Sequence, residues 1–304
     1  MTYHVRIDYS SVYELIGSFM LFVHRKWIRN VENGMEWARS IEQQLPPQWN
    51  AYSEKIRKHS LSDFDMLYAL ALERNHNDIP SYLEQLELLL TPAEWDRVGL
   101  ENGLRLGSFR LERCLELYVP ALRFWYEHYI RHSLPEWEPI LLHDAEEKRR
   151  LLDKIKPQDL IELATNGVVI PEHESLDEVI LAPMWHYRPI NNNCTFRSRI
   201  LILYPVDKPE PDLMIPSHNL RRMTEALADE KRLRILRLVG QKPYTFEEIQ
   251  EYIPLSTGAL KHHLAVLRSA GYIRTYWNGK VQRISLRPEG LADLSAFLEA
   301  YIHS

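Results

Sequence analysis

The sequence predicts a mainly α-helical protein of the α+β class, with a small β component and two domains. Three observations support this. The chain has 304 residues, enough for two domains of ordinary size. It has only 11 glycines and is rich in Leu, Glu and Arg, which favours helix. The segment "PVDKPEPDLMIP" (residues 205–216) carries four prolines and can form neither a helix nor a central strand. We therefore predict a mainly helical domain over residues 1–212 and a second domain over residues 213–304.

Capping signals and amphipathic patterns place helices through most of the first domain. Ser10 or Ser11 can cap the first helix, and "TPAE" from Thr91 is a capping box with proline at the first helical position. Pro120 is expected to kink or divide its helix, and Gly167 closes the last one. The predicted helices cover about 10–29, 35–44, 47–59, 61–74, 79–90, a segment from 91, 108–132, 135–155 and 157–166.

The end of the first domain has a different residue composition. "DEVILAPMWHYRPI" and "RSRILILYPV" are rich in β-branched and aromatic residues, and "NNNCTF" lies between them. This pattern predicts two antiparallel strands joined by an asparagine-rich loop. "VRIDYS", near the start of the chain, is a candidate third strand.

After the proline-rich segment, helices and one hairpin follow in a compact order. Helices are expected at 217–227 and 229–240, and Thr245 and Ser256 can cap the next two. Asn278–Gly279 lies between alternating residues and predicts a β-hairpin with a type I′ turn. A last helix begins at Pro288. Four helices, a hairpin and a final helix are the layout of a winged helix-turn-helix.

The helix capped by Ser256, "LSTGALKHHLAVLRSAGYI", has two different faces. Leu260, Leu264 and Leu267 recur at i, i+4 and i+7 and predict one buried stripe. Polar and small residues occupy the other side, where Gly258 keeps the helix slim enough for a close approach. Such a helix fits a major groove about 12 Å wide.

Basic side chains concentrate in the second domain, although the whole chain has a net charge of −5. Residues 213–304 hold 13 Lys and Arg against 9 Asp and Glu, whereas the preceding residues hold 24 against 33. Residues 256–287 contain six basic residues and no acidic one. This distribution predicts one surface suited to a polyanion.

The Ser256-capped helix is therefore predicted to bind double-stranded DNA. We expect Lys261 and His262 to reach base edges, and Ser256, Thr257 and Arg268 to hold phosphates. The alternative is a solvated polar face that binds nothing.

The hairpin is predicted to form a wing on the phosphate backbone or in the minor groove. Arg274, Lys280 and Arg283 are its expected contacts. The alternative is a cationic edge whose charge only prevents strand pairing. Together with the helix, the predicted DNA-binding residues are Ser256, Thr257, Gly258, Lys261, His262, Arg268, Arg274, Lys280 and Arg283.

These motifs resemble the winged helix-turn-helix of the ArsR family of bacterial transcriptional regulators. The resemblance lies in "LADEKRLRIL", in "LSTGALKHHLAVLRSAG" and in the wing "NGK", and it covers roughly the last 90 residues. It implies a homodimer that pairs through the outer helices and binds a palindromic operator. The last helix has the apolar residues that such pairing needs: Leu291, Leu294, Phe297, Leu298 and Ile302.

The chain departs from the metal-sensing members that it resembles. Those members use a cysteine pair in the helix before the recognition helix, or Asp and His ligands on the last helix. Here "TFEEIQEYI" has no cysteine, and Asp293 and His303 are an incomplete set. Because soft metals need thiolates, we expect no metal and no cofactor. His128 and His132 have zinc-like spacing but lack a third ligand, so packing or surface roles are favoured for them.

The first domain resembles, more loosely, an uncharacterised helical domain found before such winged helices in some bacterial regulators. "VILAPMWHYRPI" and "ILILYPV" carry this resemblance, which brings no known ligand with it. Seven tryptophans precede the proline-rich segment. They can line a pocket for a small apolar effector or fill the core and a dimer interface; we favour core and interface.

The sequence as a whole predicts a dimeric, sequence-specific DNA-binding regulator, most simply a repressor. Two cysteines and the absence of a signal-peptide or membrane-spanning pattern predict a cytoplasmic protein. We expect no enzymatic activity, because Cys194 has no adjacent base and no glycine-rich phosphate loop is present. Two alternatives stay open: a small-molecule-modifying enzyme with an appended winged helix, and a protein-interaction module.

Overall fold

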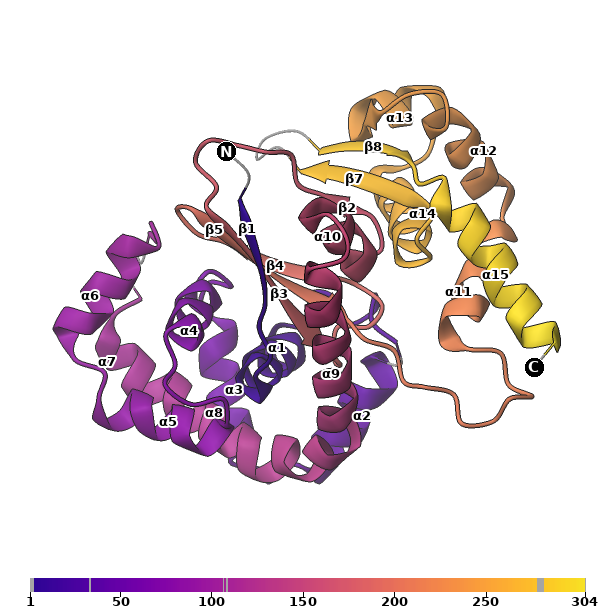
Figure 1. Cartoon of the computed structure of the whole chain (residues 1–304). Helices are drawn as coiled ribbons and strands as arrows, with labels where there is room; N and C mark the ends of the chain where they lie inside the picture. The colour runs from indigo at the N-terminus through magenta and orange to yellow at the C-terminus, as the bar shows by residue number, and fades with distance from the viewer. Residues whose placement is uncertain (1–2, 33, 106, 108, 278–281, 304) are drawn as a thin grey trace. The chain divides into compact units, whose positions relative to one another are not determined.

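The computed structural model describes residues 3–303 except 33, 106, 108 and 278–281; Figure 1 follows the chain by colour. Most described residues are helical, which confirms the mainly α class. The chain forms two units, residues 1–149 with 173–206 and residues 150–172 with 207–304. The predicted boundary at residue 213 lies close to residues 206 and 207, where the chain passes from the first unit to the second for the last time. The prediction did not assign residues 150–172 to the second unit.

The sheet of the first unit is largely parallel. Its strand order is β1-β3-β5-β4, and both β1 and β5 pair parallel with β3. The prediction of an antiparallel pair is wrong, because Val179 of β3 lies opposite Ile200 of β5 in parallel register. The segment expected as a loop contains β4, which pairs antiparallel with β5. The strands are β1 (His4–Ile7), β3 (Glu178–Met184), β4 (Asn192–Thr195) and β5 (Arg199–Pro205).

Helices of the first unit gather below its sheet in the view of Figure 1. Helix α1 starts where Ser10 accepts a hydrogen bond from Val12 N–H, and nearly all of its residues are buried. The predicted capping box is confirmed at Thr91 and Glu94. The helices are α1 (Ser11–His24), α2 (Gly34–Gln44), α3 (Trp49–Arg57), α4 (Asp63–Leu72), α5 (Ile79–Leu88), α6 (Pro92–Glu101), α7 (Leu111–Arg113), η1 (Cys114–Tyr118), α8 (Val119–Trp125), η2 (Tyr126–Ile130) and α9 (Arg131–Leu152).

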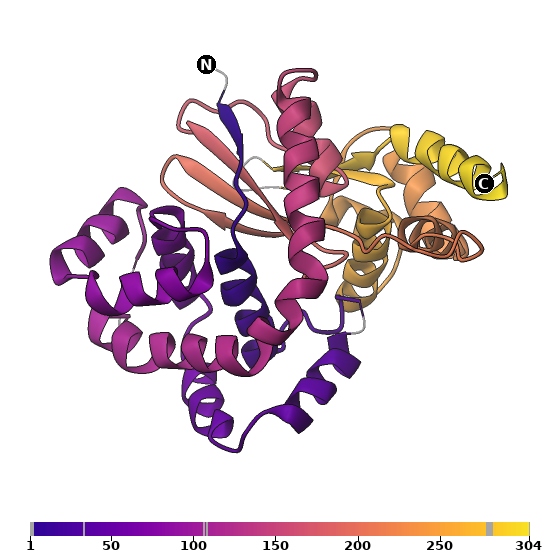
Figure 2. The ribbon, with the colours of Figure 1, turned by 60° about the horizontal axis from the view of Figure 1, so that its bottom comes forward.

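Residues 111–152 form one helical run in place of the two predicted helices. A π-helical turn, η1, ends at Tyr118, two residues before Pro120, and a second, η2, precedes α9. Wider π turns absorb irregularities in the hydrogen-bond ladder, so the run continues past Pro120. Figure 2 shows that the run changes direction between α8 and α9.

Aromatic side chains build the core of the first unit. Trp125 contacts Phe19 and Phe22, with ring centroids 6.3 and 4.7 Å away, and Trp49 lies 5.4 Å from Trp125. Trp125 and Trp137 are fully buried. The favoured prediction for the tryptophans, that they fill the core, describes these residues correctly.

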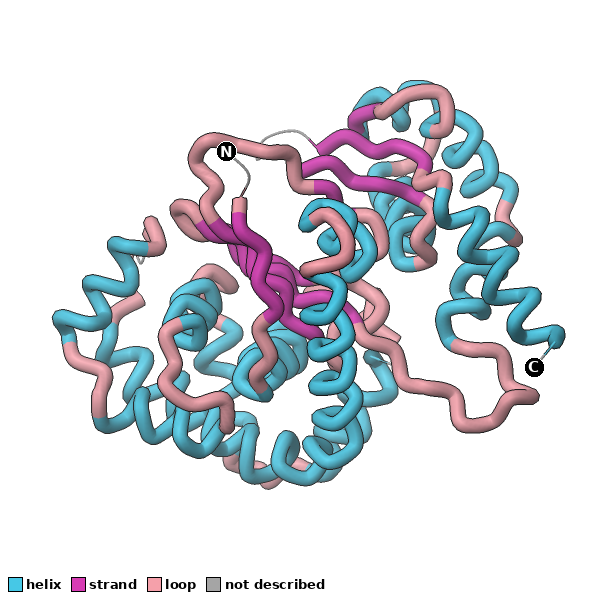
Figure 3. Tube along the Cα trace, viewed as in Figure 1, coloured by secondary structure: helices cyan, strands magenta, loops and turns pink. Residues whose placement is uncertain are grey.

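The second unit has its own four-stranded sheet, in the order β2-β7-β8-β6; Figure 3 shows the two groups of strands. Strand β7 pairs antiparallel with β8, as the predicted hairpin requires, but the Asn278–Gly279 turn lies outside the described residues. The elements are α10 (Pro157–Thr165), β2 (Val168–Val169), α11 (His218–Leu227), α12 (Glu230–Val239), β6 (Tyr244–Thr245), α13 (Phe246–Tyr252), α14 (Thr257–Ser269), β7 (Ile273–Trp277), β8 (Gln282–Leu286) and α15 (Glu289–His303).

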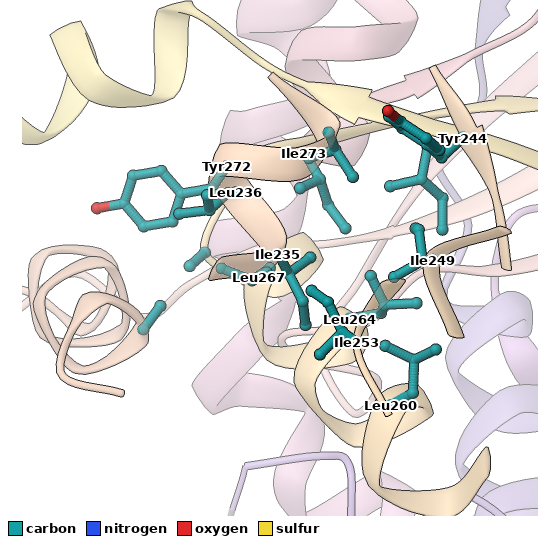
Figure 4. Packing of buried hydrophobic residues seen from close by; sticks show 14 of the residues in the cluster. Ile235, Leu236, Tyr244, Ile249, Ile253, Leu260, Leu264, Leu267, Tyr272 and Ile273 are labelled. Carbon is teal, nitrogen blue, oxygen red and sulfur yellow. The ribbon is translucent and has the colours of Figure 1, made fainter. Parts of the chain in front are cut away.

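One apolar cluster holds the second unit together (Figure 4). Ile235 from α12, Ile249 from α13 and Leu267 from α14 meet in it with Ile273 from β7. Burial of each such side chain contributes about 1.5–3 kcal/mol. Among the described helices, none is long and apolar enough to cross a membrane.

Candidate nucleic-acid interface

Helix α14 begins at the predicted cap and buries the predicted stripe. Ser256 has extended backbone angles, and its Oγ accepts a hydrogen bond from Ala259 N–H at 3.2 Å. Leu260, Leu264 and Leu267 are buried in the cluster described above. The apolar spacing therefore fixes which side of α14 faces outward.

The outward side of α14 carries the residues expected to meet DNA. Thr257, Gly258, Lys261 and His262 are all exposed. A Cβ atom placed on Gly258 would meet nothing within 4 Å, so this side is open and slim. Their contacts with DNA stay predictions, but their placement leaves them accessible to a duplex.

The turn between α13 and α14 is fixed by side-chain hydrogen bonds. A capping box joins Thr245 and Glu248 at the start of α13. The Gln250 amide nitrogen donates to Leu255 O at 3.0 Å and to Thr257 Oγ at 3.3 Å. These bonds set the angle between the two helices, so Gln250 positions α14 without being among the predicted residues.

A groove runs between α13, α14 and β8. Its lining mixes an apolar floor with polar and basic edges, the composition that suits base edges and phosphates together. The side chains that line it are Phe246, Glu247, Gln250, Thr257, Lys261, Leu264, Arg268, Gln282 and Ile284. Sequence reasoning found three of these as DNA residues, Thr257, Lys261 and Arg268. The i, i+4 spacing of Phe246 and Gln250 could have placed those two on one side of α13, whereas Gln282 and Ile284 on β8 had no local signal.

Arg268 lies deeper than expected for a phosphate contact. Its side chain is half-buried and donates from Nε to Thr275 Oγ at 3.1 Å. Burial lowers the pKa of Arg268. Because the guanidinium still lines the groove, a phosphate can meet it only from within that groove.

Arg274 is engaged by carboxylates. Its Nε donates to Glu162 at 2.6 Å, and its Nη2 donates to both oxygens of Glu289 at 3.0 Å. Phosphate binding by Arg274 would require these ion pairs to break. The sequence count of basic residues did not contain this information, because Glu162 lies 112 residues away and Glu289 lies on another element.

Three basic residues were predicted for the wing, Arg274, Lys280 and Arg283. Of the two that the structure describes, Arg283 on β8 is exposed. Lys280 lies outside the described residues. Arg287, counted in the basic run, is buried and pairs with Asp293 at 2.8 Å. Of the six basic residues in the run 256–287, Lys261 and Arg283 are thus the exposed ones that the structure describes.

Residues 229–275 match the family model described as "Bacterial regulatory protein, arsR family". This segment is an arsR-family helix-turn-helix. The match begins at Asp229, which caps α12, and ends within β7, so it includes all of α14. The match confirms the predicted resemblance to the ArsR family for this segment. The members of that family are DNA-binding transcription regulators.

Several solved structures are similar to part of the chain. An ArsR-like transcriptional regulator from Rhodococcus sp. RHA1 is 26% identical, covering 27% of this chain and 77% of its own, with a TM-score of 0.26. A homodimeric winged helix-turn-helix domain from Mycobacterium bovis is 26% identical, covering 28% and 79%, with a TM-score of 0.24. Reduced HlyU from Vibrio cholerae is 27% identical, covering 27% and 88%, with a TM-score of 0.23. No curated protein matches the chain.

The first unit contains a buried polar chain that the sequence did not predict. Glu14, fully buried, accepts hydrogen bonds from Trp185 N–H and from His186 Nδ1. His186 Nε2 lies 2.6 Å from Tyr129 Oη, which also accepts a bond from Trp37 Nε1 at 2.7 Å. Residues so far apart in sequence give no local signal of such a chain. Within the described residues, no three His, Cys, Asp or Glu side chains gather as a metal site.

Proposed function

We propose that the chain is a sequence-specific transcriptional repressor that acts in the bacterial cytoplasm and binds a palindromic operator as a homodimer. The observation that carries the proposal is the exposed side of α14, with Lys261 and His262 in an arsR-family segment. A capped helix with one buried and one open face can enter a major groove. The net negative charge of residues 1–212 disfavours further DNA contacts there.

Helix α15 is the proposed dimer surface. Leu291, Phe297, Leu298 and Ile302 are 50%, 41%, 40% and 64% exposed. A row of exposed apolar side chains on one helix is costly in water and marks an interface. The surface continues onto Met214, 81% exposed, because Tyr301 Oη donates to Met214 O at 2.9 Å. A second copy offers the same apolar surface, so the proposed occupant is α15 of that copy.

The first unit is proposed to dimerise, to sense an effector, or to do both, and not to catalyse a reaction. The chain of Glu14, His186 and Tyr129 is the arrangement closest to a catalytic one. Its atoms are hydrogen-bonded to one another and to Trp37. Burial raises the pKa of Tyr129, which keeps its hydroxyl protonated. These features favour a structural role over acid–base chemistry.

A pair of substitutions in the full chain tests the proposed contacts. Lys261→Ala and His262→Ala are each expected to lower affinity for an operator duplex by about fivefold or more, since a good base contact contributes about 1–3 kcal/mol. Lys58→Ala, in the first unit, removes an exposed lysine at a distance in sequence from the winged helix. Binding measured by fluorescence anisotropy with labelled duplex separates the three variants.

The expected result is a loss for the two α14 variants and no loss for the Lys58 control. Equal affinity for all three and the unsubstituted chain would show that α14 does not read DNA. Binding without any dependence on salt would contradict contact with phosphates, because such contacts release counterions.

A further inference from the structure

Residues 150–172, here called the inserted arm, leave the first unit and become part of the second. The chain enters the arm at the end of α9 and leaves it towards β3. Within the arm, α10 leads to the two-residue strand β2, which pairs parallel with the wing strand β7. The arm is thus a covalent connection from the first unit to the wing, placed before the arsR-family segment begins.

The arm meets the wing through a tight turn. Val168 lies opposite Thr275, and Thr275 N–H donates to Gly167 O at 2.8 Å. Gly167 has φ +112°, and a Cβ there would lie 2.4 Å from Ile273 O. A side chain at position 167 is therefore incompatible with this pairing on two grounds, backbone conformation and space.

Glu162 on α10 lies at the centre of an ion-pair network. Its Oε1 is 2.6 Å from Arg274 Nε on β7 and 3.5 Å from Arg287 Nε after β8. The two arginines continue to α15, Arg274 to Glu289 and Arg287 to Asp293. One half-buried carboxylate of the arm thereby joins the base of the wing to the helix proposed as the dimer surface.

We propose that the inserted arm is the regulatory coupling element of this protein: docking of β2 and Glu162 fixes the wing in its DNA-binding position, and undocking weakens DNA binding. Docking is expected to strengthen DNA binding, because a wing that is already fixed loses less conformational entropy when it binds. Any change in the first unit that moves the end of α9 or the start of β3 acts on the arm through the chain itself. The proposal rests on the proposed DNA binding and adds to it the route of regulation.

Glu162→Gln gives a test in which coupling and plain electrostatics predict opposite results. Removing a negative charge from a DNA-binding unit should strengthen DNA binding slightly. The coupling role predicts weaker binding, by about fivefold or more, which is the usual scale of coupling between sites. Asp159→Asn, an exposed residue of the same helix, removes the same charge and serves as the matched control. Affinity of each full chain for a mixed-sequence DNA duplex is the measurement.

Gly167→Val tests the same docking without changing any charge. It is expected to weaken duplex binding to a similar extent. The slope of the logarithm of the binding constant against the logarithm of the salt concentration should also become shallower by about 1, because the wing would lose about one phosphate contact. Far-UV circular dichroism checks that each variant keeps its helices. Glu162 and Gly167 variants that bind as tightly as the Asp159 variant overturn the proposal.

Hydrogen exchange on the unsubstituted chain tests the proposal without any variant. The Thr275 amide is bonded to the arm, so its protection reports docking directly. Added duplex is expected to slow exchange at Thr275; unchanged or faster exchange in the bound chain contradicts the proposal. If the unsubstituted chain bound no duplex at any salt concentration, the proposed function would fail and this inference with it. Normal binding with unchanged Thr275 exchange would overturn the inference alone.

Discussion

The environment of each basic residue decides whether its charge is available to DNA. Lys261 and Arg283 are exposed, whereas Arg274 is held by two glutamates and Arg268 is half-buried. Sequence reasoning identified all four as basic residues near a recognition helix. It could not assign their partners, because Glu162 and Glu289 lie on other elements. The type of a residue follows from the sequence, but its partners follow from the fold.

The Asp8–Arg74 pair shows the same principle in the first unit and leads to a pH prediction. Burial alone would raise the pKa of Asp8, but hydrogen bonds from Arg74 and Tyr13 lower it below its ordinary value. Arg74 Nη2 lies 2.7 Å from Asp8 Oδ1, and both side chains are largely buried. A depressed pKa stabilises the fold above the unfolded-state pKa, near 3.9, and this contribution is lost as the pH falls.

Asp8→Asn is therefore expected to lower the free energy of unfolding by about 3 kcal/mol at neutral pH. The difference from the unsubstituted chain should shrink as the pH falls below about 4, because Asp8 becomes protonated first in the unfolded chain and, at lower pH, in the folded chain. Urea unfolding at a series of pH values measures it. A difference that stays constant across the series would show that ionised Asp8 contributes nothing.

At the scale of elements, local patterns predicted most helices but not their long-range partners. Caps at Ser10, Thr91, Thr245 and Ser256 all form as expected. The direction of β3 against β5 was predicted wrongly, because apolar runs indicate strands without indicating which way neighbours run. Strand β2 was missed altogether: two residues cannot show a period, and their partner β7 lies about a hundred residues away.

Glycine 290 identifies a close approach between elements of the second unit. A Cβ on Gly290 would lie 2.4 Å from Gly271 O, at the point where α15 starts beside the end of α14. Gly290→Val is expected to reduce stability of the second unit by about 2 kcal/mol through overpacking. Gly258→Ala, where the added atom meets open space, is expected to leave stability unchanged or raise it. Thermal unfolding of the full chains compares them; equal transitions would contradict the close packing.

Helix α15 carries the prediction on assembly. Leu298→Lys places a charge in the proposed dimer surface and should convert a dimer to a monomer, because a buried unpaired charge costs several kcal/mol. Leu88→Lys, at an exposed leucine of the first unit, should leave the assembly unchanged. Sedimentation equilibrium gives the mass in each case. A dimer that survives Leu298→Lys would place the interface elsewhere.

At the scale of the whole molecule, a chain of net charge −5 includes an arsR-family segment in which Lys261 and His262 are exposed on α14. Residues 150–172 and 207–304 make up the unit that contains this segment, so the DNA-binding part is built from two stretches of the chain. The sequence predicted its later stretch from caps, periodicity and charge. It did not predict the earlier one, because nothing in a short helix and a two-residue strand indicates where they dock.

Selection of bound duplexes from a random-sequence DNA pool by the full chain tests the central claim most directly. The account predicts an enriched inverted repeat with half-sites about 10 base pairs apart, one turn of the duplex, and tighter binding to it than to mixed sequence by a factor of about 10³ or more. Binding to the selected duplex should fall steeply as salt rises. A pool that shows no enriched motif, or a chain that retains no duplex, would contradict the assignment of this protein as a sequence-specific regulator.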